Sequence, residues 1–312
     1  MSKAVDVIKE RGVLAFIEKC IFIPYNFCVR KSNKRKVAQL RESVYKVDLP
    51  DVETFLKNSD ESVIVSLTSF PKRFDQLVIT LKSIILQDVT PGKIVVYLGS
   101  DTKEQNITSE MRVFEFYGVE YRIDNTLNLK GHKKYFYALR EFKDKLVITI
   151  DDDIIFPSSM IKELLACHKK YPNAVCARRV HRITGRHGSL LPYNSWDIEY
   201  ARKTRPSDRI FATTGAGTLY SPYVNNALCK EAFDADKIQA LCLEADDVWM
   251  KCMEIKSSIK VVKSNIYVMG AFIDVDEEDT LMVENVGNGK NDIFLRRVIK
   301  EYGISESTLT RD

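Results

Sequence analysis

Three consecutive carboxylates, Asp151-Asp152-Asp153, directly follow an apolar run, 146–150, that is suited to a buried strand. Adjacent acids repel one another and resist removal from water, so such a group usually has a compensating cation. Hard divalent metal ions prefer oxygen ligands and often share them with a phosphate. Ligands also bind at the carboxyl ends of strands in an open α/β sheet. The triplet therefore predicts a metal site, with a solvated acidic turn as the alternative.

A second acidic pair, Asp246-Asp247, lies roughly ninety residues further along the chain and opens a predicted helix. A positioned carboxylate can act as a general base towards a hydroxyl group, whose own pKa lies far above neutrality. Acids in the first turn also stabilise any helix, by a few tenths to about 1 kcal/mol. Both interpretations remain open for this pair considered alone.

The elements that must position these acids begin at residue 62, where strand-like and helix-like patterns alternate. Such alternation indicates βαβ units and a mainly parallel sheet flanked by helices, an α/β fold. A less regular section follows at 178–220. We expect one catalytic domain, 46–312, after an N-terminal appendage, 1–45. The predicted strands are 62–67, 93–98, 119–123, 146–150 and 174–177, and the predicted helices are 74–86, 108–117, 132–142, 158–170 and 291–302.

The appendage carries ten Lys and Arg residues against four Asp and Glu residues, although the whole chain has a net charge of only +4. An amphipathic helix is predicted first, then an aromatic segment, 20–27, and a basic run, 30–36. This combination suits the surface of an anionic membrane. A helix packed on the main domain with a solvated basic loop is the alternative. The stretch 13–29 is interrupted by charges and a proline, so it is a poor transmembrane span.

The totals place the 312-residue chain among ordinary globular proteins, with 45% hydrophobic and 29% charged residues. The small net charge gives no indication of nucleic-acid binding. Seven scattered cysteines argue against a disulfide framework or a zinc site and favour a reducing compartment. No cleavable signal peptide is evident, so a cytoplasmic location is expected.

Four motifs, considered together and in order, resemble those of nucleotide-sugar glycosyltransferases of the GT-A fold, close to the bacterial family-2-like enzymes. Thr68-Ser69-Phe70 resembles the nucleotide-binding turn, and Asp151-Asp152-Asp153 resembles the DxD motif. Gly215-Ala216-Gly217 resembles the acceptor-side loop, and Ala245-Asp246-Asp247 resembles the xED motif. The resemblance covers about residues 62–255 and implies a GT-A-type, Rossmann-like sheet.

The resemblance implies donor-side roles for several residues. Asp153 would bind Mn²⁺ or Mg²⁺, and Asp151 would reach the ribose or the metal through water. Asp152 would contact the donor sugar. Either Lys133 or Lys134 would supply positive charge to the leaving diphosphate, as would Arg73. Thr68 and Phe70 complete the implied donor site.

The resemblance also implies an acceptor side and a base. Asp247 would deprotonate the acceptor hydroxyl with Asp246 in support, which implies direct displacement with inversion. Gly215 and Gly217 would line the acceptor site. Trp196 and Trp249 are candidates for a face that stacks on a sugar ring, although buried aromatic residues more often belong to a core.

The implied function is transfer of a sugar from a nucleoside-diphosphate sugar, with a UDP-sugar as first choice, to a glycan or lipid-linked acceptor. The implied setting is surface-polysaccharide synthesis, with the appendage making peripheral contact with the inner face of the membrane. Alternatives are a nucleotidyltransferase acting on sugar phosphates, a haloacid-dehalogenase-type phosphohydrolase, and a non-catalytic glycan-binding scaffold. The first would normally carry a glycine-rich loop where 68–73 has none.

Two features depart from the family pattern. An acid that would hold the nucleobase occurs only at Asp101, which is offset from the end of the second strand. No histidine follows His187 to serve as a late metal ligand, so Asp274, Asp276 or water would have to substitute.

Overall fold

The computed structural model describes residues 13–124, 126–264, 269–273 and 289–310. Asp274 and Asp276 lie outside the described residues. A seven-stranded sheet has the order β12-β6-β11-β4-β1-β2-β3. β11 runs antiparallel to both of its neighbours, and the other pairs are parallel. The strands are β1 (Ser59–Ser69), β2 (Thr90–Leu98), β3 (Val119–Ile123), β4 (Leu146–Ile150), β6 (Val175–Ala177), β11 (Ala216–Tyr220) and β12 (Val261–Lys263).

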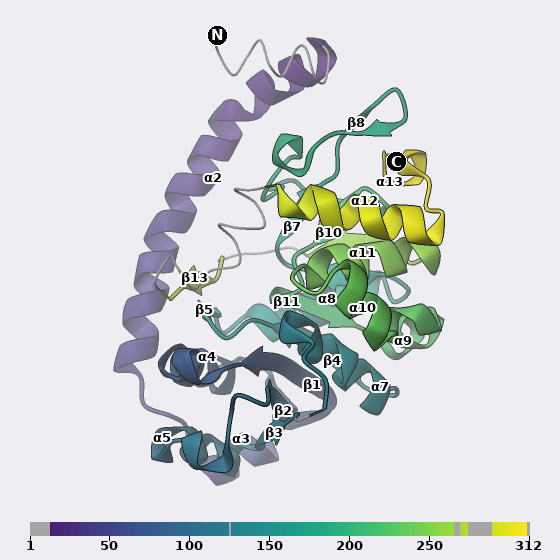
Figure 1. Cartoon of the computed structure of the whole chain (residues 1–312). Coiled ribbons are helices and arrows are strands. Elements are labelled where there is room, and N and C mark those ends of the chain that lie inside the picture. The colour runs from purple at the N-terminus through teal and green to yellow at the C-terminus, as the bar shows by residue number, and fades with distance from the viewer. Residues whose placement is uncertain (1–12, 125, 265–268, 274–288, 311–312) are drawn as a thin grey trace.

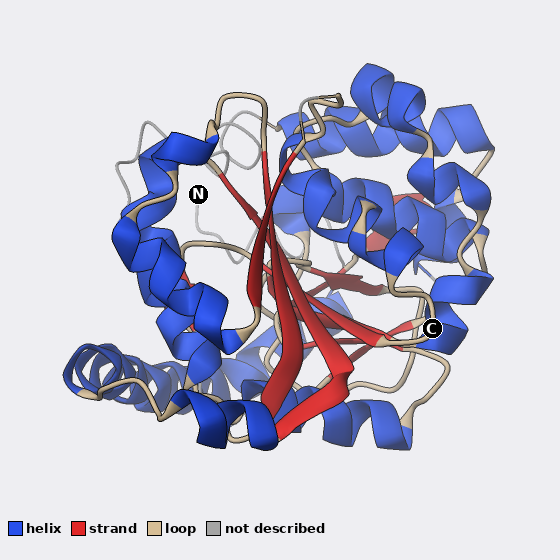
Figure 2. Ribbon diagram, turned by 90° about the horizontal axis from the view of Figure 1, so that it is seen from below, coloured by secondary structure: helices blue, strands red, loops and turns tan. Residues whose placement is uncertain are grey.

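Helices cover both faces of this sheet, as Figure 2 shows, which confirms the predicted α/β fold with a mostly parallel sheet. Val63 and Val65 of β1 pack in one apolar cluster, and Ile64 between them packs in the other. Successive strand residues point to opposite faces, so a continuous apolar run buries both. The longer flanking helices are α4 (Phe74–Ile85), α8 (Met160–Lys170), α11 (Asp246–Lys256) and α12 (Lys290–Tyr302).

Shorter elements complete the domain around this framework. They comprise three small strand pairs, short α-helices and turns of 3₁₀-helix. The strand pairs are β5 (Ile154–Ile155) with β13 (Ala271–Phe272), β7 (Val180–Arg182) with β10 (Ile210–Ala212), and β8 (Gly185–Arg186) with β9 (Ser189–Leu190). The short helices are α3 (Val52–Lys57), α5 (Ser109–Val113), α6 (Lys133–Phe136), α7 (Ala138–Glu141), α9 (Pro222–Ala227), α10 (Ala235–Leu241) and α13 (Glu306–Thr310).

The helix α2 (Val13–Lys46) runs along one side of the domain, and its C-terminal part lies beside β5 and β13 (Figure 1). Val44 packs with Ile155 and Ala271 in a small apolar cluster. We expected a helix, then an aromatic segment and then a basic loop. In the structure, α2 instead continues as one helix through both the aromatic segment and the basic run. The basic run is rich in good helix formers, which explains its helical state. In the described part of the chain, no helix is long and apolar enough to cross a membrane.

Two local predictions were wrong in detail. The predicted strand 93–98 begins three residues too late, because β2 already includes residues 90–92 and its Thr90 pairs with Ser59 of β1. The predicted helix 132–142 is interrupted at Tyr137, so that α6 and α7 are separate short helices. The remaining predicted elements of the sheet and its helices lie within a few residues of those observed.

Replacing Leu67, which is fully buried on β1, tests the core on which the sheet depends. Leu67→Ala should lower the free energy of unfolding by about 2–5 kcal/mol, because it removes apolar contacts and leaves a cavity. The matched change Leu56→Ala, at a side chain that is 49% exposed, should change it by less than about 0.5 kcal/mol. Urea unfolding followed by circular dichroism measures both; equal effects would contradict this assignment of the core.

Candidate functional site

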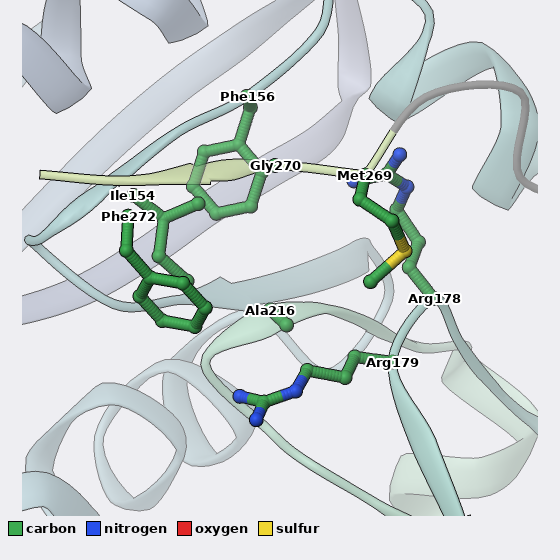
Figure 3. A pocket seen from close by; sticks show the side chains of 8 residues that line it. All are labelled: Ile154, Phe156, Arg178, Arg179, Ala216, Met269, Gly270 and Phe272. Carbon is green, nitrogen blue, oxygen red and sulfur yellow. The ribbon is translucent and has the colours of Figure 1, made fainter. Parts of the chain in front are cut away.

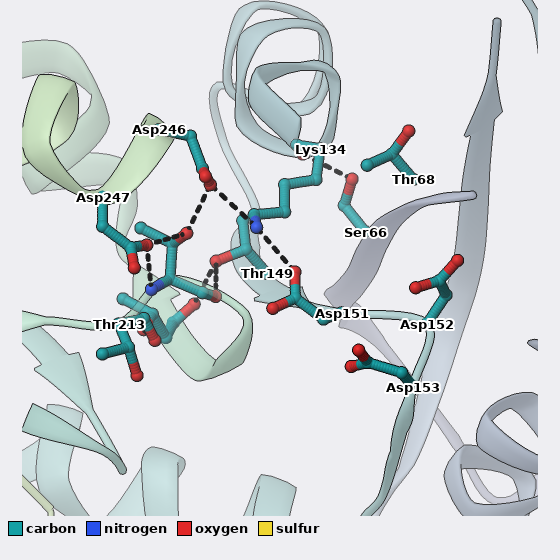
Figure 4. A network of polar contacts seen from close by, with 12 residues as sticks. Ser66, Thr68, Lys134, Thr149, Asp151, Asp152, Asp153, Thr213, Asp246 and Asp247 are labelled. Carbon is teal, nitrogen blue, oxygen red and sulfur yellow. Dashed lines mark hydrogen bonds and ion pairs between the residues drawn. The ribbon is translucent and has the colours of Figure 1, made fainter. Parts of the chain in front are cut away.

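A buried lysine joins the two acidic motifs. The Lys134 ammonium lies 2.7 Å from Asp151 Oδ1 and 2.8 Å from Asp246 Oδ2, and only 3% of the lysine side chain is exposed (Figure 4). Ser66 on β1 donates a hydrogen bond of 2.6 Å to the Lys134 carbonyl, which fixes this turn of α6 on the sheet. Burial opposes the charge of Lys134, but Asp151 and Asp246 raise its pKa. The ammonium therefore remains charged and holds the two motifs together.

The segment before β11 holds the second acid pair. The Thr214 amide donates to Asp247 Oδ1 at 2.7 Å, and its hydroxyl lies 2.7 Å from both Asp246 Oδ2 and Asp247 Oδ1. Thr149 on β4 donates to the Thr214 carbonyl at 2.7 Å. Because β11 pairs with β4, this contact ties the N-terminus of α11 to the strand that precedes the acid triplet.

Gly215 lies directly under Asp151. Its carbonyl accepts a 2.7 Å hydrogen bond from the Asp151 amide. A Cβ atom at residue 215 would lie 1.6 Å from Asp151 Oδ2, so a larger residue would displace this carboxylate. Glycine is required here because it lets the backbone lie close to the Asp151 carboxylate. This role differs from direct contact with an acceptor.

The three acids of the triplet have different environments. Asp151 and Asp153 extend towards the same side in Figure 4, with side chains 43% and 17% exposed. Asp152 is buried, and its carboxylate accepts from Ser69 Oγ at 2.6 Å and Arg73 Nη1 at 3.1 Å. The protein itself thus supplies partners for both oxygens of Asp152, and its contact with the donor sugar stays a prediction.

Asp151 and Asp153 offer carboxylate oxygens, the ligand type that a hard divalent cation prefers. Burial, with repulsion from Asp151 and Asp152, raises the pKa of Asp153 to about 7, even though Arg73 lies 3.0 Å away. Burial and the neighbouring carboxylates thus disfavour the charged form of Asp153, which a bound cation would favour. Within the described ranges, no three His, Cys, Asp or Glu side chains form a metal site. A magnesium-like ion bound by one or two carboxylates usually completes its coordination with water and substrate phosphates.

The two acids of the second pair have pKa values that are shifted in opposite directions. Although burial opposes it, attraction to Lys134 lowers the pKa of Asp246 to about 2. Burial, with repulsion from Asp246, raises the pKa of Asp247 to about 7. Asp246 is consequently a fixed anion, whereas Asp247 can exchange a proton near neutral pH, as a general base must.

Thr68, Phe70 and Arg73 all lie at or just after the carboxyl end of β1, next to the triplet. The Thr68 hydroxyl donates to the Tyr97 carbonyl at 2.7 Å, and the Arg73 guanidinium lies 5.4 Å from the centre of the Phe70 ring. The sequence left Lys133 and Lys134 as alternatives for the positive charge near the diphosphate. In the structure, Lys134 contacts Asp151 and Asp246, whereas Lys133 lies near the end of β2. A Cβ at Gly99 would lie 3.1 Å from Lys133 Nζ and 2.9 Å from Asp101 Oδ1, so both groups border the end of β2.

Three of the predicted acceptor residues are buried. Trp249 is fully buried, and its indole donates to the Ala232 carbonyl at 3.1 Å. Trp196 is 3% exposed and packs on Tyr193. Gly217 is buried against Arg178 and has a φ of +95°, which favours glycine. These three residues lie in the interior, and their predicted contact with an acceptor stays a prediction.

Sequence reasoning missed Thr214 and Ser69 as organising residues. Both are common polar residues whose importance depends on partners far away in the chain: Thr214 contacts Asp247, and Ser69 contacts Asp152. The available signals were the place of Ser69 inside the nucleotide-binding turn and that of Thr214 directly before Gly215-Ala216-Gly217.

Comparisons with known proteins give limited information. No family model matches the chain, and no curated protein matches it. One similar solved structure is S. aureus TarS 1-349, with a TM-score of 0.44 and 14% identity, covering 80% of this chain and 73% of that chain. The same protein in complex with UDP has a TM-score of 0.44 and 13% identity, covering 79% and 73%. A likeness at this level assigns neither a family nor an activity to this chain.

The raised pKa of Asp247 makes stability depend on pH. Its carboxyl has a folded-state pKa of about 7, above the ordinary 3.8, so ionisation costs the folded state increasingly between about pH 4 and 7. Asp247→Asn should therefore gain stability relative to the parent protein as pH rises, on the order of 2 kcal/mol between pH 5 and 8. Urea unfolding at the two pH values measures this gain. Asp144→Asn, at an exposed position, should show no such trend; a flat Asp247→Asn profile would contradict the assignment.

Proposed function

We propose that this protein is a metal-dependent, inverting glycosyltransferase that uses a nucleoside-diphosphate sugar, with a UDP-sugar as first choice. The supporting observation is the Lys134 bridge, which brings Asp151 of the triplet and Asp246 of the second acid pair within 3 Å of one ammonium group. A cation-binding carboxylate and a candidate base must lie close together if both act on one glycosidic bond. The motif resemblance supplies the reaction class.

The donor side of the proposed site comprises the ends of β1, β2 and β4. A bound Mn²⁺ or Mg²⁺ ion would be held by Asp153 and Asp151 and would neutralise charge on the leaving diphosphate. Arg73 orients Asp153 through its 3.0 Å contact and adds positive charge beside it. Lys133 and Asp101 border the space after β2, where a donor and an acceptor of hydrogen bonds are available to a nucleobase.

The acceptor hydroxyl would lose its proton to Asp247. Asp247 is partly exposed as a residue, and Thr214 contacts one of its carboxylate oxygens, so the other would face the substrate. Lys134 stabilises Asp246 as an anion, and Asp246 in turn raises the proton affinity of Asp247. Attack by the deprotonated oxygen, with departure of the nucleoside diphosphate from the opposite face, would invert the anomeric carbon.

Separate substitutions should distinguish donor binding from chemistry. Asp153→Asn should abolish Mn²⁺-dependent binding of UDP, because it removes a proposed ligand of the ion. Asp247→Asn should retain this binding but lower turnover of the matching UDP-sugar by about 10²–10⁴-fold, the usual contribution of a general base. Calorimetric titration with UDP and a panel of UDP-sugars, with and without Mn²⁺, measures binding, and release of UDP measures turnover.

Asp144→Asn, an exposed change just before β4, is the matched control and should leave both properties unchanged. If no nucleotide binds in the presence of Mn²⁺, the transferase proposal fails and a non-catalytic scaffold becomes the better explanation. Binding that survives in Asp153→Asn would instead refute the assigned ion site.

We further propose that α2 contacts an anionic membrane surface where a lipid-linked acceptor would be found. Val13, Ile17 and Ile21 are 58%, 47% and 65% exposed, and their spacing of four residues places them along one side of the helix. Lys34 and Lys36, which follow on the same helix, are exposed too. Exposed apolar side chains and exposed basic ones further along the same helix suit the boundary between lipid headgroups and acyl chains.

Sedimentation with vesicles tests this contact. The parent protein should bind vesicles that contain phosphatidylglycerol, and replacing Val13, Ile17 and Ile21 with Ser should weaken binding at least about tenfold. Phe116→Ser, which removes an equally exposed apolar side chain elsewhere, should have little effect. Equal binding by the parent and the triple variant would contradict the proposal.

A further inference from the structure

Two acids of the triplet are tied by their backbones to segments on the side of α4 and β13. The Asp152 carbonyl accepts a hydrogen bond from the Thr80 hydroxyl of α4 at 2.8 Å. The Asp153 carbonyl accepts a hydrogen bond from the Ile273 amide, directly after β13, at 2.8 Å. Since Asp153 is a proposed ligand of the ion, the position of β13 affects the proposed ion site.

The strand β13 is short, and its position depends on its neighbours. Among the strands that the structure describes, it pairs with β5 alone, and Phe272 lies beside Ile154 (Figure 3). A Cβ atom at Gly270 would lie 2.6 Å from Ile154 Cγ2 and 3.2 Å from the Ile155 carbonyl oxygen, so glycine allows this close approach. An isolated pair of strands is marginally stable at best in water, so β13 needs further support.

The C-terminal part of α2 supplies this support. The Arg41 guanidinium donates a hydrogen bond to the Phe272 carbonyl. Val44, one turn further along α2, is buried and packs with Ala271 and Ile155. Figure 1 shows this part of α2 beside β5 and β13. The outer edge of a strand presents carbonyl groups without strand partners, and Arg41 satisfies one of them.

One peptide group connects α2 to the triplet. The carbonyl that accepts from Arg41 and the amide that donates to Asp153 both belong to the peptide bond between Phe272 and Ile273. A peptide group is planar and rigid, so fixing its oxygen also fixes the direction of its N–H group. Hydrogen bonds on the two sides of such a group also strengthen one another.

We propose that Arg41 is a positioning residue for the ion site and acts through the peptide group that follows Phe272. It fixes the backbone of Asp153, whereas Arg73 orients the Asp153 carboxylate. This inference rests on the proposed function, because it takes Asp153 as a ligand of the ion. It gives the C-terminal part of α2 a role in donor binding that is separate from the membrane contact proposed for residues 13–21.

Titration of the full-length protein with Mn²⁺ at saturating UDP, with free Mn²⁺ followed by electron paramagnetic resonance, tests the proposal. Arg41→Met keeps an unbranched side chain but removes its donors. It should weaken Mn²⁺ binding at least about fivefold, because loss of an outer contact that orients a ligand weakens metal binding. Arg41→Lys, which keeps a donor, should weaken it less. Lys46→Met, which removes a 70% exposed charge from the same end of α2, is the matched control and should bind like the parent protein.

A second variant tests whether the effect passes through β13. Gly270→Ala should also weaken Mn²⁺ binding, because the added methyl group would push β13 away from Ile154. If both changes act through β13, the double variant should bind little more weakly than the weaker-binding single variant. Losses that multiply in the double variant would show that Arg41 acts by another route and would overturn the proposal.

Mn²⁺ binding equal to that of the parent protein, in an Arg41→Met variant that circular dichroism shows to be folded, would also overturn the positioning role. Hydrogen exchange at the Ile273 amide gives a readout that needs no ion. It should be faster in Arg41→Met than in the parent protein, and equal rates would contradict the proposal. Should Arg41→Met not fold, the same two measurements on Arg41→Lys and Gly270→Ala decide the question.

The two hypotheses fail in different ways. A parent protein that binds neither Mn²⁺ nor UDP refutes the transferase proposal, and the positioning role for an ion fails with it. A parent protein that binds both, together with a folded Arg41→Met variant that binds them equally well, refutes only the inference about Arg41.

Discussion

The Lys134 ammonium is the interaction on which the geometry of the candidate site depends. A buried cation is costly unless carboxylates surround it, and here Asp151 and Asp246 do so at hydrogen-bonding distance. These carboxylates come from a strand end and from a helix start, so one ion cluster fixes the relative positions of two elements. Balancing the buried charge of Lys134 thus fixes where the two elements lie, in addition to contributing to stability.

The antiparallel strand β11 makes this cluster possible. Its pairing with β4 brings Thr214 and Gly215 to the end of the strand that leads into the acid triplet. Gly215 leaves room for the Asp151 carboxylate, and Thr214 holds Asp247. One short segment therefore supports both acidic motifs.

Adjacent acids acquire different protonation behaviour from their environments. Lys134 lowers the pKa of Asp246 to about 2, whereas burial and its charged neighbour raise that of Asp247 to about 7. In the triplet, Asp152 is turned into the protein by Ser69 and Arg73, whereas the side chains of Asp151 and Asp153 are 43% and 17% exposed. In both groups, a few contacts give neighbouring acids different surroundings.

The sequence by itself determined the fold class, most of the sheet strands and helices, and the choice of acids at strand and helix ends. These are local properties, since periodicity and strand-end composition depend on neighbours in the chain. Only the tertiary structure decided that Trp196 and Trp249 lie in the core, that Asp152 faces inward, and that Lys134 rather than Lys133 joins the acid motifs. Side-chain direction and charge pairing depend on partners brought together from roughly a hundred residues apart. No local pattern encodes such contacts, because the free energy that selects them arises only when the sheet and helices pack.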